Sequence, residues 1–276
     1  MSEIIAGRLW QASGWIDGAA PGITWLPEQF PGRLRINAYA LRDGEEWIGI
    51  DTGLPVHWDA IREGLAPSLP GTTRRRLLNT RREQDGMANL PAMLRTFAIT
   101  EAPYVGVLNP LELTGVAGAA ATPRLAVDEI LAVGRLRIQP LRVLLRLLAT
   151  NWFFEHHTGT LFTSDSFGWI TDDAPADAAS QRAGFNAFGD SASTHPALMM
   201  GAKFDWLRGI DAAPILADLD AVMDRPIQRI CPGQGRVIEG ADAVRAAHAT
   251  LRHAISRLAA QPAARWTMPA WIKETT

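Results

Sequence analysis

The sequence has little of what would indicate a disulfide-linked, exported or membrane-embedded protein. Its 276 residues include one cysteine, Cys231, which excludes an internal disulfide and favours a reducing cytoplasm as its location. The longest apolar stretch, residues 141–154, contains Arg142, Arg146 and Asn151, so it predicts no membrane span and no membrane partner. The first residues hold no basic segment followed by an apolar run, so we expect no signal peptide.

An excess of charge of one sign is also lacking. The formal net charge is −2, which by itself indicates neither a nucleic-acid-binding nor a membrane-surface protein. Arginines at 74–76 and at 81–82 make one locally basic run, but no aromatic residues alternate with them. We therefore expect a solvated patch or the docking site of an acidic ligand, and no nucleic-acid partner.

Tyrosine is scarce, with two residues against ten tryptophans. Five of the tryptophans lie toward the two ends of the sequence: Trp10, Trp15, Trp25, Trp266 and Trp271. Large aromatic side chains serve both in cores and at interfaces, so core packing and a homodimer contact both remain open.

Short apolar runs that suit strands alternate with amphipathic segments that suit helices. Asp43-Gly44 separates two strand-like runs within residues 33–54 and predicts a hairpin, and a second hairpin is expected over residues 152–165. Helices are expected near residues 56–64, 87–97, 210–224 and 241–259, and further strands near 75–80, 104–107, 136–140 and 226–232. This alternation predicts a layered α/β fold.

The chain reads as one domain over residues 1–260, followed by a tail, residues 261–276, that is a possible oligomer contact. Residues 172–200 are rich in Ala, Ser, Asp and Gly and predict a long loop.

Four segments place polar residues directly after apolar strands, where an α/β fold builds its site. They are residues 50–53, 79–86, 161–168 and 231–235. Together they supply the carboxylates of Asp51, Glu83, Asp85 and Asp165. Carboxylates that share one pocket raise one another's pKa unless cations lie between them, so this site needs positive charge.

The order and spacing of these segments over roughly residues 33–240 resemble the metallo-β-lactamase superfamily. In that family a strand ending in Asp-Thr-Gly is followed by a Thr-His-x-His-x-Asp-His loop, a further His, an Asp in Leu-Phe-x-x-Asp, and a His in Pro-x-His-Gly. The flavodiiron-like branch, with His-x-Glu-x-Asp and Leu-Phe-x-x-Asp-x-Phe-Gly, is the most similar. Glu83, Asp85 and Asp165 match its carboxylates, and Phe167 and Gly168 match the residues that follow. The resemblance implies a four-layer αβ/βα sandwich.

The same resemblance shows that every histidine ligand is replaced. Arg81 and Gly86 stand where the loop histidines would be, Gln234 replaces the last one, and residues 145–150 contain none. A zinc or iron site needs deprotonated ligand atoms, whereas arginine stays protonated and offers only donors. We therefore expect a degenerate, metal-free site.

In this interpretation Arg81, with Arg146 as a second candidate, supplies the positive charge that a metal centre would have supplied. A guanidinium pairs with both oxygens of a carboxylate in a planar fork, and Gln234 adds a neutral donor and acceptor. We assign catalytic candidates to Asp85, Glu83 and Arg81. The ligand-binding candidates are Asp51, Asp165, Gln234, Arg146 and His195.

The histidines offer little to replace the lost ligands. His156 and His157 precede Asp165 by eight or more positions across the predicted second hairpin, and an extended strand of that length spans well over ~15 Å. They are expected in a solvated turn. His195 lies in the predicted long loop, and it is the one histidine that we retain.

Three functions from different classes fit these observations. The first is a metal-free relative of the hydrolases that binds a small, anionic ligand or a partner protein in the ancestral pocket. The second is a hydrolase that uses Glu83, Asp85 and Asp165, either with one divalent cation such as magnesium or manganese or without metal. The third is an oligomeric scaffold. Because the chain shows no flavodoxin segment before it ends at Thr276, we expect no flavin and no oxygen chemistry.

Overall fold

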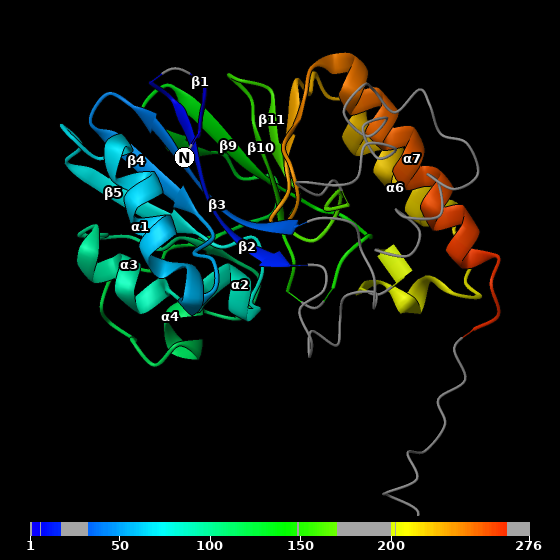
Figure 1. Ribbon diagram of the computed structural model, residues 1–276, viewed down its shortest axis with the longest axis horizontal. Coiled ribbons are helices and arrows are strands. Elements are labelled where there is room, and N and C mark those ends of the chain that lie inside the picture. The colour runs from blue at the N-terminus through cyan, green and yellow to red at the C-terminus, as the bar shows by residue number, and fades with distance from the viewer. Residues whose placement is uncertain are drawn as a thin grey trace, which may run out of the picture.

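The protein is described here by a computed structural model that covers residues 2–5, 7–17, 33–147, 149–169, 200–201 and 203–263. Its strands form two main sheets and a short two-stranded one (Figure 1). The strands are β1 Ser2–Ile5, β2 Leu9–Asp17, β3 Arg33–Asp43, β4 Glu46–Ile50, β5 Arg74–Leu78, β6 Tyr104–Val105, β7 Arg124–Leu125, β8 Leu131–Val133, β9 Leu136–Leu141, β10 Trp152–Glu155, β11 Thr160–Phe162, β12 Arg229–Cys231 and β13 Ile238–Glu239.

The helices lie on the outer faces of the two main sheets (Figure 1). The α-helices are α1 Trp58–Leu65, α2 Gln84–Met87, α3 Leu90–Thr96, α4 Pro110–Leu113, α6 Ala213–Met223 and α7 Ala241–Ala259. Short 3-10 helices are η1 Pro55–His57, η2 Ala66–Ser68 and η5 Asp205–Leu207. In Figure 1, α1 and α3 flank the sheet that contains β4 and β5, while α6 and α7 stand beside the other sheet.

Each main sheet contains one parallel pair of strands among antiparallel ones. The first sheet has the order β1-β2-β3-β4-β5, and β4 runs parallel to β5 with Ile50 opposite Leu78. The second has the order β13-β12-β11-β10-β9-β8, and β11 runs parallel to β12 with Phe162 opposite Cys231. Parallel neighbours end at the same edge of a sheet, so the segments after β4 and β5, and those after β11 and β12, emerge side by side.

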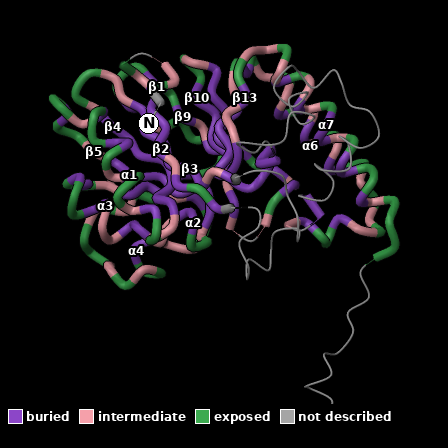
Figure 2. Tube along the Cα trace, in the orientation of Figure 1, coloured by how far each residue is buried: buried purple, intermediate pink, exposed green. Residues whose placement is uncertain are grey.

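The alternation of side chains along the buried strands produces the layers. On β4, Trp47 packs toward α1 and α3, whereas Ile48 packs between the two sheets. On β10, Phe153 packs between the sheets, whereas Trp152 and Phe154 face the side of α6 and α7. Successive residues of a strand point to opposite faces, so strands buried on both faces separate three apolar layers. Figure 2 shows the buried chain concentrated in these central strands.

These layers confirm the α/β sandwich that the sequence predicted. The hairpin at Asp43-Gly44 is β3–β4, with Asp43 opposite Glu46 and Gly44 at φ +62°, and the second predicted hairpin is β10–β11. The two N-terminal strands were not predicted; β2 pairs along its whole length with β3, from Leu9 opposite Leu41 to Asp17 opposite Arg33. None of the helices in the described ranges is both long enough and apolar enough to cross a bilayer.

The predicted oligomer contacts fall largely outside the described residues. Trp25, Trp266, Trp271 and nearly all of the predicted loop at 172–200 lie there. Trp10 is buried against α1, because it belongs to the apolar layer on that side of the first sheet, whereas Trp15 is 42% exposed. The homodimer stays a prediction, and Trp10 is a core residue rather than a surface one.

Candidate functional site

The ends of the two parallel strand pairs meet at one edge of the sandwich. Asp51 follows β4, residues 79–86 follow β5, residues 163–168 follow β11, and Pro232 to Gly235 follow β12. An isolated bridge between Ile36 and Gln234 joins the two sheets here. Residues far apart in the sequence are thus brought to one place by the topology.

Asp51 is held in a conformation that few residues adopt. Its φ is 60°, in the left-handed region, which aspartate tolerates better than most side chains. Thr80 donates to its carboxylate twice, from the backbone nitrogen at 2.7 Å and from the hydroxyl at 2.5 Å. Burial nonetheless raises the pKa of Asp51 to about 6, even though Arg81 and Thr80 act in the opposite direction.

Arg81 lies at the centre of the carboxylates, with none of its side chain exposed. Its Nε donates to Asp85 Oδ1 at 2.7 Å, and its Nη2 lies 2.7 Å from Asp85 Oδ2. Its Nη1 lies 3.4 Å from Asp51 Oδ2, and its Nε lies 3.8 Å from Asp165 Oδ1. Burial alone would lower the pKa of Arg81, but these three carboxylates raise it well above its ordinary value. The guanidinium therefore stays charged.

The backbone makes room for Arg81 at two glycines, Gly233 beside the guanidinium and Gly86 beside the Cγ. A Cβ on Gly233 would lie 2.0 Å from Arg81 Nη1, and a Cβ on Gly86 would lie 2.7 Å from Arg81 Cγ and 2.8 Å from its carbonyl oxygen. The resemblance noted in the sequence aligns Gly86 with the last histidine of the loop motif. The space that a histidine there would need is filled by Arg81.

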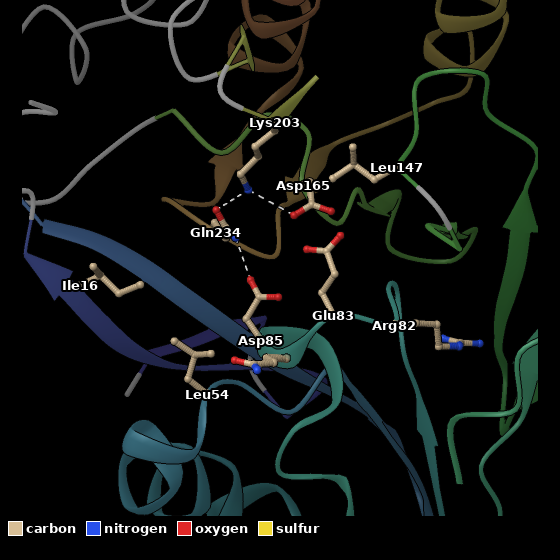
Figure 3. Close-up of a pocket in the computed structure, with 10 residues that line it drawn as sticks. Ile16, Leu54, Arg82, Glu83, Asp85, Leu147, Asp165, Lys203 and Gln234 are labelled. Atoms are coloured by element: carbon tan, nitrogen blue, oxygen red, sulfur yellow. Dashed lines mark hydrogen bonds and ion pairs between the residues drawn. The ribbon is translucent and has the colours of Figure 1, made fainter. Parts of the chain in front are cut away.

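A chain of polar contacts runs from Asp85 to Asp165. Gln234 donates from Nε2 to Asp85 Oδ2 at 2.7 Å and accepts through Oε1 from the Lys203 ammonium. Lys203 also donates to Asp165 Oδ1 at 3.1 Å, and Ser164 donates to Asp165 Oδ2. Figure 3 shows this chain as dashed lines from Asp85 through Gln234 and Lys203 to Asp165.

Asp85 is fully ionised at neutral pH as a result. Burial would raise the pKa of Asp85, but Arg81, Lys203 and the Gln234 amide outweigh that effect and hold it at about 2. A carboxylate with so low a pKa is a weak base at neutral pH.

These groups form the floor of a pocket of about 620 Å³. Its lining comes from both sheets and their loops: Ile16, Leu54, Arg82, Glu83, Gln84, Asp85, Leu147, Asp165, Lys203 and Gln234 (Figure 3). Arg81 and Asp51 do not line it, because they are buried beneath Asp85. We had expected both to face a ligand; in the structure they support the floor instead.

Glu83 is the carboxylate most open to this pocket. It is an exposed residue, and Figure 3 shows its carboxylate pointing toward Asp165. Partial desolvation, with repulsion from Asp165 and Asp85, raises the pKa of Glu83 to about 7. At neutral pH this group therefore exists in both protonation states.

Side chains of the first sheet hold the loop after β12 in place through hydrogen bonds. Asn37 donates from Nδ2 to the carbonyl oxygens of Pro232 and Gly235 at 2.9 and 2.8 Å, and the Tyr39 hydroxyl donates to Pro232 at 2.7 Å. Asn37 in turn accepts from Gln11 and Ser13. These buried bonds set the position of Gln234, which lies in the same loop.

Two predicted site residues are not brought to the cluster by the described structure. The Arg146 side chain is exposed, and the described contacts of the carboxylates do not include it. Its place as second cation is taken by Lys203, which the sequence reasoning missed because Lys203 lies near a segment without any periodic pattern. His195 lies outside the described residues.

The remaining candidates lie away from the site. His156 and His157 occupy the β10–β11 turn, where His156 shares a hydrogen bond with Gln139 at 2.8 Å. Cys231 is buried, and burial raises its pKa far above the ordinary range, as expected for an inert thiol.

The charges of the arginine run at residues 74–76 and 81–82 are largely neutralised by carboxylates within the fold. Arg76 is buried and paired with Glu46 and Glu101, and Arg74 contacts the same two carboxylates. Across the residues that the structure covers, no three His, Cys, Asp or Glu side chains are grouped so that they could hold a metal ion.

Solved structures share this architecture at low sequence identity. Rubredoxin oxygen:oxidoreductase from Desulfovibrio gigas aligns with 92% of this chain and 61% of its own, at 17% identity and a TM-score of 0.66. A fragment of a putative diflavin flavoprotein from Nostoc aligns with 90% of this chain and 92% of its own, at 15% identity and 0.60. A metallo-β-lactamase from Pontibacter korlensis aligns with 91% of this chain and 97% of its own, at 12% identity and a TM-score of 0.50.

The chain spans about three fifths of the length of the D. gigas protein, and a similar share, 58%, of the flavodiiron protein from Giardia intestinalis. No protein-family model matches the sequence, and no curated protein matches it. At these identities the similarity establishes the fold. The chain has the metallo-β-lactamase-type fold, in the form found in the flavodiiron proteins.

Proposed function

We propose that this chain binds a small molecule in the pocket without a metal ion, and that the Arg81 guanidinium takes the place of a metal centre. The observation that carries this proposal is the position of Arg81, sealed from solvent between Asp51, Asp85 and Asp165. A fixed positive charge at that point compensates the buried carboxylates, as a bound cation would.

A dinuclear metal centre does not fit these residues. Arg81 fills the space in front of both glycines, with its Cγ and carbonyl oxygen at Gly86 and its guanidinium at Gly233, and the guanidinium carries only donors. Gln234, in the position of the last histidine, is already bonded to Asp85 and Lys203. The proposal therefore includes no metal centre at these residues.

A single divalent cation on Glu83, Asp85 and Asp165 is also disfavoured. Both oxygens of Asp85 face Arg81, and one of them also accepts from Gln234. Both oxygens of Asp165 accept bonds as well, from Lys203 and from Ser164. Magnesium or manganese would have to compete with these donors for the same carboxylate oxygens.

Metal analysis of the purified full-length protein tests the proposal. The protein is dialysed against a chelator, incubated with zinc, iron or manganese, desalted and measured by plasma mass spectrometry. We expect less than about a tenth of an equivalent of each metal, because a structural or catalytic site of this fold would retain it tightly. A stoichiometric metal would refute the arginine-for-metal proposal.

A second candidate function, metal-free hydrolysis, is favoured by Glu83. This carboxylate opens on the pocket, and a base with a pKa of about 7 is well matched to proton transfer at neutral pH. Turnover of a panel of p-nitrophenyl esters in the presence of a chelator would test it. Turnover that rises through pH 7 and is lost in Glu83→Gln supports a hydrolase, and turnover equal in both proteins contradicts it.

A further inference from the structure

The charges that open on the pocket differ from those expected from the sequence. An anionic ligand was predicted because arginines precede the site. In the structure Arg81 lies beneath the floor, and the Arg82 guanidinium donates to the carbonyl oxygens of Leu108 and Asn79. Figure 3 shows Arg82 pointing away from the other lining residues. Neither arginine is therefore positioned to receive an anion.

Three carboxylates line the pocket, those of Glu83, Asp85 and Asp165. Lys203 lines it with them, and its ammonium is already engaged by Asp165 and Gln234. The negative charge of Asp85 is offset by Arg81 beneath it. Glu83 has no such direct contact: among the described residues no hydrogen bond or ion pair reaches its carboxylate, and Arg81 and Lys203 act on it only from a distance. Among the described lining residues, Glu83 is therefore the carboxylate whose charge is not compensated by a direct partner.

The rest of the lining is apolar. Ile16 from β2 and Leu54, which follows the strand β4, stand on one side of the pocket, and Leu147 stands across from them (Figure 3). Leu54 and Leu147 are only partly buried and pack against the apolar layer next to α6 and α7. A ligand that fills the pocket therefore meets a carboxylate at one point and hydrocarbon at others, which is the usual composition of a small-molecule site.

We propose that the pocket takes an organic cation, namely a protonated amine or guanidine carried on an apolar body, with the cationic group at Glu83 and the body against Ile16, Leu54 and Leu147. This inference rests on the proposed function, since it assumes that no metal fills the pocket. A cation at Glu83 would gain a charge-assisted hydrogen bond, whereas an anion there would meet Asp165 and Asp85 as well.

Three matched probes test the charge preference: hexylamine, hexanol and hexanoate, which share one hydrocarbon chain and differ in charge. Binding to the full-length protein, whose metal content has been measured, is followed by saturation-transfer NMR and by titration calorimetry. We expect hexylamine to bind at least about tenfold more tightly than hexanoate, with hexanol between them. Equal binding of the three probes, tighter binding of hexanoate, or no binding of hexylamine would overturn the inference.

A pair of variants locates the cation. Glu83→Gln keeps the shape of the side chain and removes its charge, so hexylamine binding should weaken about tenfold while hexanol binding stays unchanged. Glu63→Gln, on the exposed face of α1, is the matched control and should leave both unchanged. If Glu83→Gln binds hexylamine as the parent does, the proposed site is wrong. A metal-loaded protein would instead refute the underlying proposed function, so the two failures are distinguishable.

Discussion

Arg81 and Asp85 lie four positions apart and form a two-point ion pair, with Nε to Oδ1 and Nη2 to Oδ2 both at 2.7 Å. The pair is almost sealed from water: Arg81 is fully buried and Asp85 is 6% exposed. Asp85 belongs to the short helix α2, and Arg81 belongs to the loop just before it. The loop that follows β5 is thus closed by its own side chains.

Arg81→Ala should destabilise the fold substantially. The substitution leaves Asp51, Asp85 and Asp165 buried without their shared cation, and breaking a buried pair costs about 3–5 kcal/mol. For a chain of this size we expect the melting temperature to fall by on the order of 10 °C in differential scanning calorimetry. Arg62→Ala, in an exposed pair with Asp59, is the control and should change little. An unchanged melting temperature for Arg81→Ala would show that the guanidinium does not stabilise the cluster.

Gly233→Ala should be destabilising only while Arg81 is present. The new Cβ would lie 2.0 Å from Arg81 Nη1. The side-chain and backbone shifts that such overpacking forces typically cost about 1–3 kcal/mol of stability. In an Arg81→Ala background the same change should cost less, and a double-mutant cycle of urea unfolding measures the difference. Additive effects of the two substitutions would contradict the close packing of Gly233 on the guanidinium.

Arg81→His should not create a metal site. One histidine adds a single nitrogen ligand, while Gly86 and Gln234 still stand in the other histidine positions. We expect the variant to hold no more zinc or iron than the parent protein after desalting, as measured by plasma mass spectrometry. Stoichiometric zinc in Arg81→His would mean that one substitution restores the site.

The contribution of Glu83 to the stability of the protein should decrease from acidic to neutral pH. The pKa of this group rises from its ordinary 4.5 to about 7 in the folded state, so the folded protein keeps the proton to higher pH than the unfolded chain. The stabilisation is present below pH 4.5 and is lost as the pH rises to about 7. Glu83→Gln cannot titrate, so its melting temperature should vary less over this window; an identical pH profile would exclude the raised pKa.

The ionisation of Asp85 should change stability in the opposite direction to that of Glu83, and at lower pH. Its folded-state pKa of about 2 lies below the ordinary 3.8, so its ionised form stabilises the fold above that value. The stabilisation should be lost as the pH falls from 3.8 toward 2, and Asp85→Asn should show less of this acid-induced loss when unfolding is followed by circular dichroism. A variant that loses stability as steeply as the parent would argue against the low pKa.

Part of the site could be predicted because strand ends carry a recognisable pattern. Asp51, Glu83, Asp85, Asp165 and Gln234 each follow an apolar run, and the structure brings all five together with Arg81. Lys203 has no such signal, since nothing in its neighbours indicates that its ammonium reaches Asp165. The anionic ligand stays a prediction from the sequence, because a sequence shows which arginines are present but not which carboxylates neutralise them.

The sequence alone determined the layered α/β fold and the two hairpins, because apolar periodicity and turn residues are local properties. Only the tertiary structure decided that Arg81 is buried beneath the pocket floor, that Arg146 stays at the surface and that Lys203 replaces it. Burial and ion pairing depend on distances between segments far apart in the chain. Asp85 and Gln234, 149 positions apart and 2.7 Å from each other, show why those distances follow from the topology and not from the order of residues.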